Sequence, residues 1–264
     1  MKVANPVRRK LSEGGVILCG MLRLPNPAAA EIMAASGIEM ICIDNEHYPF
    51  NPETVEKIAR AGQIHGASVF IRIPNKDPAT IAQMLDCGVQ GIKIPHVDTK
   101  EEAQAVVDAV KYAPVGRRGF CPITRGAAYG YELSPADFTV DANRETLIAI
   151  MVETKTGLEN MDEILTVDGI DIIAIGPSDV SASYGLPGQP DHPVVKAAID
   201  EASKKVIASG RQLCTLVKNE QQAWEALEMG ARIFQIGSEL QMLTGGFSAL
   251  VREVKESVGT AEKE

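Results

Sequence analysis

Two carboxylates stand just after neighbouring apolar runs of the sequence. Glu153 ends the run TLIAIMVE, and Asp179 follows the run IDIIAI within the segment IGPSDVSAS. Two carboxylates that converge in a partly buried site repel each other and need a shared proton or a divalent cation. A hard cation such as Mg²⁺ or Mn²⁺ takes oxygen ligands and keeps waters, which leaves room for a chelating substrate. Glu153 and Asp179 are therefore candidate metal ligands, although each could instead cap a helix.

The segment GPSD adds a candidate anion site beside these carboxylates. Free backbone N–H groups of Ser178 and Asp179, at the start of a helical turn, suit a small carboxylate. Gly176 permits a close approach because it has no Cβ. A Gly-Pro pair is also common in ordinary turns, which is the alternative interpretation.

Two further segments place polar groups where apolar runs stop. Arg72, in FIRIPN, stays charged and must find an anion, either a substrate or a structural partner such as Asp86 or Glu46. In CIDNEHYPF, His47 is a candidate general base, with Asp44 fixing its tautomer and orientation. A histidine in a loop can also be simply solvated.

The elements that must position these residues alternate between short β-branched runs and longer amphipathic stretches. The pattern predicts eight strands, at 15–22, 40–44, 68–73, 91–95, 146–153, 170–175, 212–216 and 233–236. Eight strands alternating with helices in one domain, residues 1–264, predict a parallel (β/α)8 TIM barrel. An open doubly wound sheet is the alternative, although no glycine-rich dinucleotide fingerprint follows the first strand. On a barrel, all strand ends point at one shared volume, so these residues should meet there.

The C-terminal segment 239–264 follows the last predicted strand. Its pattern predicts a helix interrupted at Gly245–Gly246, which could dock on its own barrel or on a neighbouring subunit. The stretch 113–144 is rich in Gly, Pro and Arg and is too long for a simple connection.

Composition limits the classes of function. The net charge of −9 argues against a nucleic-acid or membrane-surface role, both of which call for a basic patch. Five widely spaced cysteines without a CxxC pair indicate reduced thiols. The sequence shows neither a signal peptide nor an apolar run long enough to span a membrane. We therefore expect a soluble cytoplasmic protein.

Taken together, the motifs resemble the metal-dependent (class II) pyruvate aldolases of the HpcH/HpaI family, which includes 4-hydroxy-2-oxoheptane-1,7-dioate and 2-keto-3-deoxy sugar-acid aldolases. The matching segments run in family order from about 15 to 240: IDNEH, RIPN, MLDCGVQGIKIPHVDTKEEA, YAPVGRRG, VETKTGLENMDEIL, GIDIIAIGPSDVSASYG and DHP. The resemblance implies a TIM barrel of the phosphoenolpyruvate/pyruvate-domain type. It also implies a C-terminal helix exchanged between subunits of a homohexamer.

The resemblance further implies a reaction and its ligands. A divalent ion (Mg²⁺, Mn²⁺ or Co²⁺) held by Glu153 and Asp179 would stabilise a pyruvate enolate, with Arg72 contacting the keto oxygen. The enolate adds to an aldehyde, or a 4-hydroxy-2-oxo acid is cleaved in reverse. Backbone amides of Ser178 and Asp179 would hold the carboxylate, and Leu216 would line the aldehyde side.

The resemblance implies that His47 is the base, acting through a water and steered by Asp44, with Asp86 a partner in that network. Some positions depart from the family pattern. Lys93 and His96 stand where many relatives have apolar residues, and Glu239 stands near the last strand where an Asp is frequent. These departures affect the aldehyde partner rather than the pyruvate half.

Other functions stay open from the sequence. Lys93 could be the nucleophile of a Schiff-base aldolase. Related lyases decarboxylate oxaloacetate or cleave acyl-CoA thioesters, for which Arg117, Arg118 and Arg125 are candidate CoA contacts. A non-catalytic carboxylate-binding protein would keep Arg72 but would have no use for His47.

Overall fold

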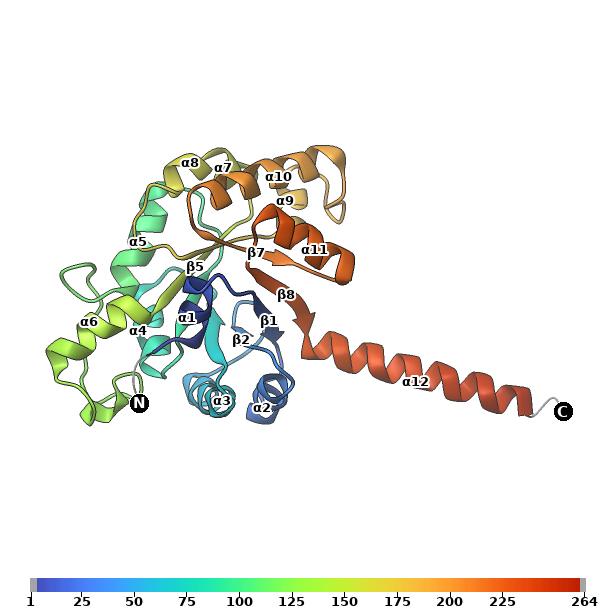
Figure 1. Cartoon of the computed structure of the whole chain (residues 1–264), viewed down its shortest axis with the longest axis horizontal. Helices are drawn as coiled ribbons and strands as arrows, with labels where there is room; N and C mark the ends of the chain where they lie inside the picture. The colour runs from blue at the N-terminus through green and yellow to red at the C-terminus, as the bar shows by residue number, and fades with distance from the viewer. Residues whose placement is uncertain (1–3, 262–264) are drawn as a thin grey trace.

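Eight parallel strands, hydrogen-bonded in sequence order and joined again from β8 to β1, close into a barrel in the computed structural model, which describes residues 4–261 (Figure 1). The strands are β1 (Ile17–Leu22), β2 (Met40–Asp44), β3 (Ser68–Arg72), β4 (Gly91–Ile94), β5 (Leu147–Val152), β6 (Ile172–Ile175), β7 (Gln212–Leu216) and β8 (Ile233–Ser238). All eight predicted strands and the TIM barrel are confirmed, and the open doubly wound sheet is wrong.

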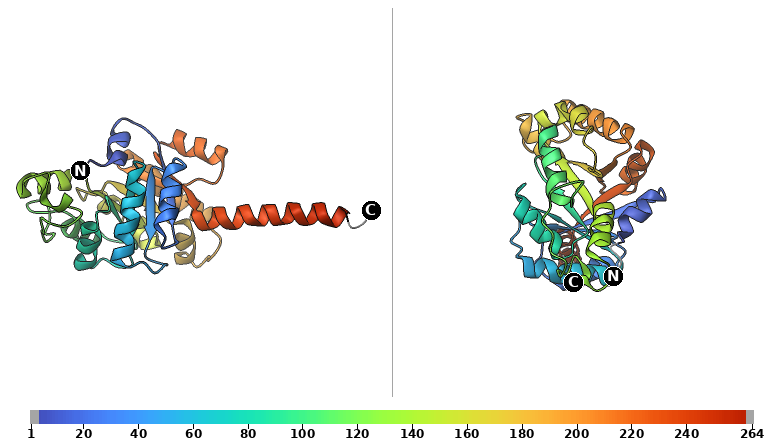
Figure 2. Two further views of the ribbon diagram at one scale, coloured as in Figure 1. Left: turned by 90° about the horizontal axis from the view of Figure 1, so that it is seen from below. Right: turned by 90° about the vertical axis from the view of Figure 1, so that its left-hand side faces the viewer.

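Helices follow the strands and surround the barrel (Figure 2). They are α1 (Pro6–Ser12), α2 (Pro27–Ala35), α3 (Pro52–Ile64), α4 (Pro78–Asp86), α5 (Lys100–Val110), α6 (Pro135–Glu145), α7 (Lys155–Glu159), α8 (Met161–Ile164), α9 (Pro177–Ser183), α10 (Pro193–Ala208), α11 (Glu220–Met229) and α12 (Glu239–Ala261), with a short 3-10 helix η1 (Ala128–Gly130). Many begin with a capping side chain and a proline. Asn51, for example, accepts a hydrogen bond from the Thr54 N–H at 2.8 Å, and Pro52 opens α3.

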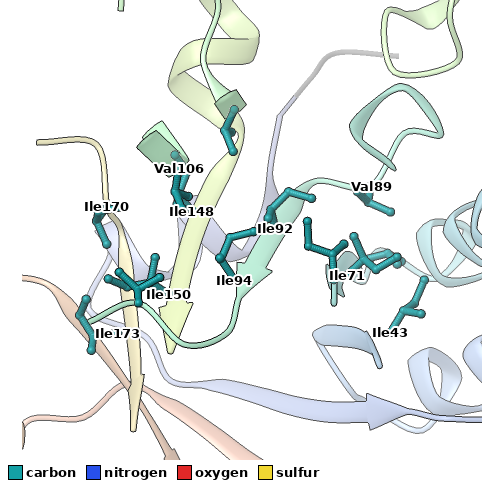
Figure 3. Packing of buried hydrophobic residues seen from close by; sticks show 14 of the residues in the cluster. Ile43, Ile71, Val89, Ile92, Ile94, Val106, Ile148, Ile150, Ile170 and Ile173 are labelled. Carbon is teal, nitrogen blue, oxygen red and sulfur yellow. The ribbon is translucent and has the colours of Figure 1, made fainter. Parts of the chain in front are cut away.

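Alternation along the strands sorts their side chains into two cores. Outward residues such as Ile71, Ile92 and Ile150 pack with one another and against the helices (Figure 3). Inward residues such as Cys42 and Phe70 fill the barrel interior. Because successive strand residues point to opposite faces, Arg72 at the end of β3 points inward like Phe70. The same alternation directs the polar strand ends into the barrel mouth.

The amino end of the barrel is closed by α1, which the sequence analysis did not predict. Val7 of α1 belongs to the interior core. The Asn5 side chain accepts a hydrogen bond from Ser68 Oγ at 2.6 Å and donates to the carbonyl oxygens of Gln90 at 3.0 Å and Glu145 at 3.2 Å. These contacts tie Asn5, which directly precedes α1, to the starts of β3, β4 and β5.

The C-terminal helix differs from its prediction. α12 runs through Gly245–Gly246 as one 23-residue helix and extends away from the barrel (Figures 1 and 2). The stretch 113–144 contains η1 and most of α6 and connects α5 to β5, so it lies toward the amino ends of the strands. In the part of the chain that the structure describes, no helix has both the length and the apolar character needed to cross a bilayer.

We expect Gly91→Ala to destabilise the fold, because a Cβ at this position would overlap the Phe70 ring in the barrel interior. Overpacking of this kind costs about 1–3 kcal/mol, which urea denaturation would measure. Gly119→Ala is the matched control, since a Cβ there meets no atom within 4 Å. Equal unfolding midpoints for wild type and the Gly91 variant would contradict the close packing described here.

Candidate active site

Strand register places three charged residues side by side at the barrel mouth. Asp44 on β2 is the register partner of Arg72 on β3, and Arg72 is the partner of Lys93 on β4. All three are buried, with Asp44 fully inaccessible and Lys93 5% exposed. The grouping follows from parallel strands that start and end at similar heights, so sequence position along each strand decides which side chains meet.

Arg72 is held by two carboxylates. Its Nη2 lies 2.8 Å from Asp44 Oδ2, its Nε lies 3.2 Å from Asp44 Oδ1, and the same Nε lies 3.1 Å from Glu46 Oε2. Burial opposes the charge, but the hydrogen bond and the attraction of Asp44 outweigh it, so the pKa of Arg72 lies above its ordinary value. Of the two structural partners considered from sequence, Glu46 is present and Asp86 is not.

The two candidate metal ligands face the same space. Glu153 directly follows β5 and is 2% exposed, and Asp179 lies in the first turn of α9. A Cβ built on Gly176 would lie 2.9 Å from Glu153 Oε2 and 3.3 Å from Asp179 Oδ2. Burial raises the pKa of Glu153, a hydrogen bond from the His96 backbone opposes the rise, and the charges of Asp179 and Glu46 add to it. The arrangement is one that a cation would relieve.

The chemistry of the donors fits a hard cation. Within residues 4–261, no group of three or more His, Cys, Asp or Glu side chains is arranged to hold a metal ion. A cation here would therefore have two protein carboxylates and take its remaining ligands from water and substrate, as Mg²⁺ commonly does.

The start of α9 leaves backbone donors without a side-chain cap. Its N-cap residue is Gly176, which offers no side-chain acceptor, and Pro177 follows. The N–H groups of Ser178 and Asp179 in this first turn can therefore point at an external anion. The role expected of these two residues, which is to hold a substrate carboxylate, stays a prediction.

His96 is a contact that sequence reasoning left without a role. It adopts a left-handed conformation (φ 53°), and its backbone N–H donates to Glu153 Oε1 at 2.9 Å. Its ring Nδ1 lies 3.2 Å from the same oxygen, and Nε2 lies 3.7 Å from Glu46 Oε1. His96 thus holds one oxygen of Glu153 and leaves Oε2 facing Gly176. His96 directly follows the segment IKIP at the end of β4, and this position in the sequence could have predicted its place in the site.

His47 lies at the mouth with a 60% exposed side chain. Asp44 Oδ1 accepts a hydrogen bond from the His47 backbone N–H at 3.3 Å, and the ring Nε2 lies 3.6 Å from Glu46 Oε2. Asp44 therefore anchors the turn that carries His47 but does not contact the imidazole. The expected steering of the ring by Asp44 is not what the structure shows.

Asp86 lies away from this group. It is the last residue of α4, which ends just before β4 begins, so it lies at the amino end of the barrel. Its Oδ1 lies 2.6 Å from Nη2 of the buried Arg118, and its carbonyl accepts from the Gly126 N–H at 3.0 Å. Within this chain, the expected place of Asp86 beside His47 is not observed.

A cavity of about 90 Å³ opens among these strand ends. Its lining includes Arg72, Gly176 and Leu216, and also Lys93 and Arg23. Leu216, at the end of β7 and 42% exposed, therefore shares a cavity with the arginine expected to contact the keto oxygen. None of the described residues that line the cavity is an aspartate or a glutamate. The cavity is large enough for several waters or a small organic acid.

The sequence and the fold of the chain are similar to those of known proteins. The sequence profile of the HpcH/HpaI aldolase/citrate lyase family matches residues 21–245. A pyruvate aldolase of Rhizobium etli is 34% identical over 246 residues, which covers 93% of this chain and 96% of that protein. A 4-hydroxy-2-oxo-heptane-1,7-dioate aldolase of Salmonella arizonae is 35% identical over 229 residues, covering 87% and 86%. The crystal structure of an HpcH/HpaI aldolase from Desulfitobacterium hafniense superposes with a TM-score of 0.89 at 27% identity, covering 95% and 96%.

We expect Asp44→Asn to destabilise the protein by about 3 kcal/mol, because it removes one of the two carboxylates that contact the buried Arg72 and leaves that charge to Glu46 alone. Urea denaturation at neutral pH would measure the loss. Asp162→Asn is the control: Asp162 is exposed and lies 2.9 Å from Lys205 Nζ, so its loss should stay below about 1 kcal/mol. Similar losses for the two variants would show that the pair at Arg72 is not essential to the fold.

Proposed function

The chain belongs to the HpcH/HpaI aldolase/citrate lyase family, and we propose that it is a carbon–carbon lyase that cleaves 4-hydroxy-2-oxo acids to pyruvate and an aldehyde, and joins them in reverse. One observation carries the proposal: Glu153 Oε2 and Asp179 Oδ2 border the same space at Gly176, which also lines the cavity that contains Arg72. Carboxylates that could hold a cation thus adjoin a cationic cavity that suits a small keto acid.

Glu153 and Asp179 are the residues that would hold a divalent ion, either Mg²⁺, Mn²⁺ or Co²⁺. When bound, such an ion supplies Lewis-acid polarisation of the keto oxygen and acidifies the adjacent methyl group. His96 contributes by occupying Oε1 of Glu153, which keeps Oε2 free for the ion.

Arg72 would bind the keto oxygen and the negative charge that develops on it. Its Nε and Nη2 are taken by Asp44 and Glu46, whereas the one hydrogen bond of Nη1 within residues 4–261 goes to the weak acceptor Met151 Sδ at 3.7 Å. Nη1 is therefore the donor left for a substrate oxygen, and the carboxylates fix its direction before substrate binds. The Ser178 and Asp179 amides would hold the substrate carboxylate, and Leu216 would border the aldehyde.

His47 would remove the methyl proton through an intervening water. Its exposed ring at the mouth suits contact with water more than direct contact with a buried substrate. Asp44 would contribute by anchoring the backbone of the turn. Because Asp86 pairs with Arg118 at the other end of the barrel, we assign it no part in this proton transfer within one chain.

Related lyase activities remain the second candidate, since the family name includes citrate lyase. The CoA version has less support, because two of its three candidate arginines are engaged elsewhere. Arg118 pairs with Asp86, and Arg125 is buried and donates to the carbonyl oxygens of Cys87 and Gly88. Decarboxylation of oxaloacetate would use the same keto-acid site, and an assay for release of carbon dioxide would separate it from aldol cleavage.

The C-terminal helix supports assembly with further copies of the chain. α12 exposes large apolar side chains that recur at helical spacing, at Leu243, Phe247, Leu250, Val254 and Val258. An exposed apolar stripe on a helix that leaves its own barrel needs a partner surface. We therefore propose that α12 packs on a neighbouring subunit of a homohexamer.

We also propose a cytoplasmic location, because all five cysteines are free thiols.

We expect the protein with Mg²⁺ to exchange the methyl protons of pyruvate for deuterium in D₂O, which tests the first half-reaction without knowledge of the aldehyde. Glu153→Gln and Asp179→Asn should each lower both the exchange rate and the Mg²⁺ affinity by at least about a hundredfold. Proton NMR measures the exchange, and calorimetry measures the affinity.

His47→Ala separates the base from the metal ligands. It should slow exchange by about 10²–10⁴-fold and leave Mg²⁺ affinity unchanged, whereas His65→Ala, at the C-cap of α3, should change neither. Wild-type protein that exchanges nothing would refute the aldolase proposal, and exchange that survives complete removal of metal would refute the role of the cation.

We expect Phe247→Glu combined with Leu250→Glu to reduce the assembly to smaller species, because charges would replace the centre of the apolar stripe. Sedimentation velocity measures the size. Glu253→Lys, on an exposed polar position of the same helix, is the control and should leave the assembly intact. A monomeric wild type would contradict the proposed packing of α12.

A further inference from the structure

Lys93 is a buried cation that has no anionic partner in the described part of the chain. It lies on β4, is 5% exposed, and its Nζ donates to the neutral amide oxygen Gln235 Oε1 at 3.3 Å. Among residues 4–261, no carboxylate lies within ion-pair distance of this Nζ. Its register neighbour Arg72, by contrast, contacts two carboxylates.

The other neighbours of Lys93 do not neutralise it. Cys19, Cys42 and Cys214 surround it in the barrel interior. Burial raises the pKa of Cys42 to about 11 and raises that of Cys19 and Cys214 as well, so these thiols are uncharged at neutral pH. The nearby guanidinium of Arg72 is of like charge. An uncompensated charge in the interior is expensive, so it calls for a partner that arrives from outside.

The cavity at the strand ends is the route for such a partner. Lys93 and Arg72 both line it, together with Arg23, and no described acidic residue does. This is a cationic space in a chain whose net charge is −9. The charged residues that line the cavity are thus all cations, which favours entry of a small anion.

We propose that Lys93 is a second cationic contact for the substrate, donating from the barrel interior to an oxygen of the bound 2-oxo carboxylate. The inference rests on the proposed aldolase function and deepens it, because it gives Lys93 a role in binding the substrate. Lys93 then acts as a hydrogen-bond donor and charge, not as a nucleophile, and forms no covalent bond. The ligand class is a small planar 2-oxo acid or its enolate, for which oxalate is a stable mimic.

The test measures oxalate binding by calorimetry to wild type and to Lys93→Met, in metal-stripped protein and again with Mg²⁺. Methionine keeps the length of the side chain and removes its charge. Loss of a charge-assisted hydrogen bond should weaken oxalate binding about ten- to a hundredfold in both states. Lys57→Met, an exposed lysine on α3, is the control for the loss of one positive charge and should bind as wild type does. Equal oxalate affinity in wild type and Lys93→Met overturns the proposal.

Two further readouts keep the outcome clear. Lys93→Met should raise the thermal midpoint, because it removes an unpaired buried charge; a lower midpoint would mean that Lys93 serves the fold. Lys93→Gln provides a second neutral variant, and it should also bind oxalate more weakly. Trapping of pyruvate on Lys93 by borohydride would overturn the proposal in favour of a Schiff base. Wild-type methyl exchange is measured in parallel: if it fails, the aldolase function fails, whereas normal exchange with unaltered oxalate affinity in the variants rejects only the role of Lys93.

Discussion

The pairing of Arg72 with Asp44 across β2 and β3 is the interaction on which the site depends. Both side chains are buried, and strand register brings them together, so β2 and β3 must pair in this register before the two charges meet. Removing two charges from water is costly, and the pair is tolerated because bidentate contact and a further carboxylate, Glu46, complete the set of acceptors. The result is a guanidinium held in one orientation, with a single nitrogen, Nη1, left for another molecule.

The charged residues of the site are sorted by whether they line the cavity. Acidic groups of Glu46, Glu153 and Asp179 lie at the strand ends, whereas the cavity itself is lined by cations such as Arg72 and Lys93. A keto acid that bridges a cation at the rim and the donors in the interior would meet both needs at once. This division explains how an acidic protein can bind an anionic substrate without a basic surface.

Much of this architecture could be predicted from the sequence, because short β-branched runs that alternate with amphipathic stretches indicate the strands and helices of the barrel. The bounds of β2 and β7 were predicted to the residue, and the polar residue at each strand end follows from them. Asp86 was expected in the network of His47, but within this chain it lies at the amino end of the barrel. The order of the elements already implies this position, because a residue at the end of α4 lies before β4 begins. The left-handed backbone of His96 and the unbroken helix through Gly245–Gly246 depend on contacts and chain geometry that propensity alone does not contain.

The contacts of Asn5 at the amino end of the barrel have a consequence for folding during translation. Asn5 is synthesised well before its partners, because Ser68, Gln90 and Glu145 follow it by 63, 85 and 140 positions. These contacts at the amino end of the barrel therefore cannot all form until Glu145 has been translated. Such late, non-local closure makes the nascent chain dependent on protection from aggregation while its interior is still open to water.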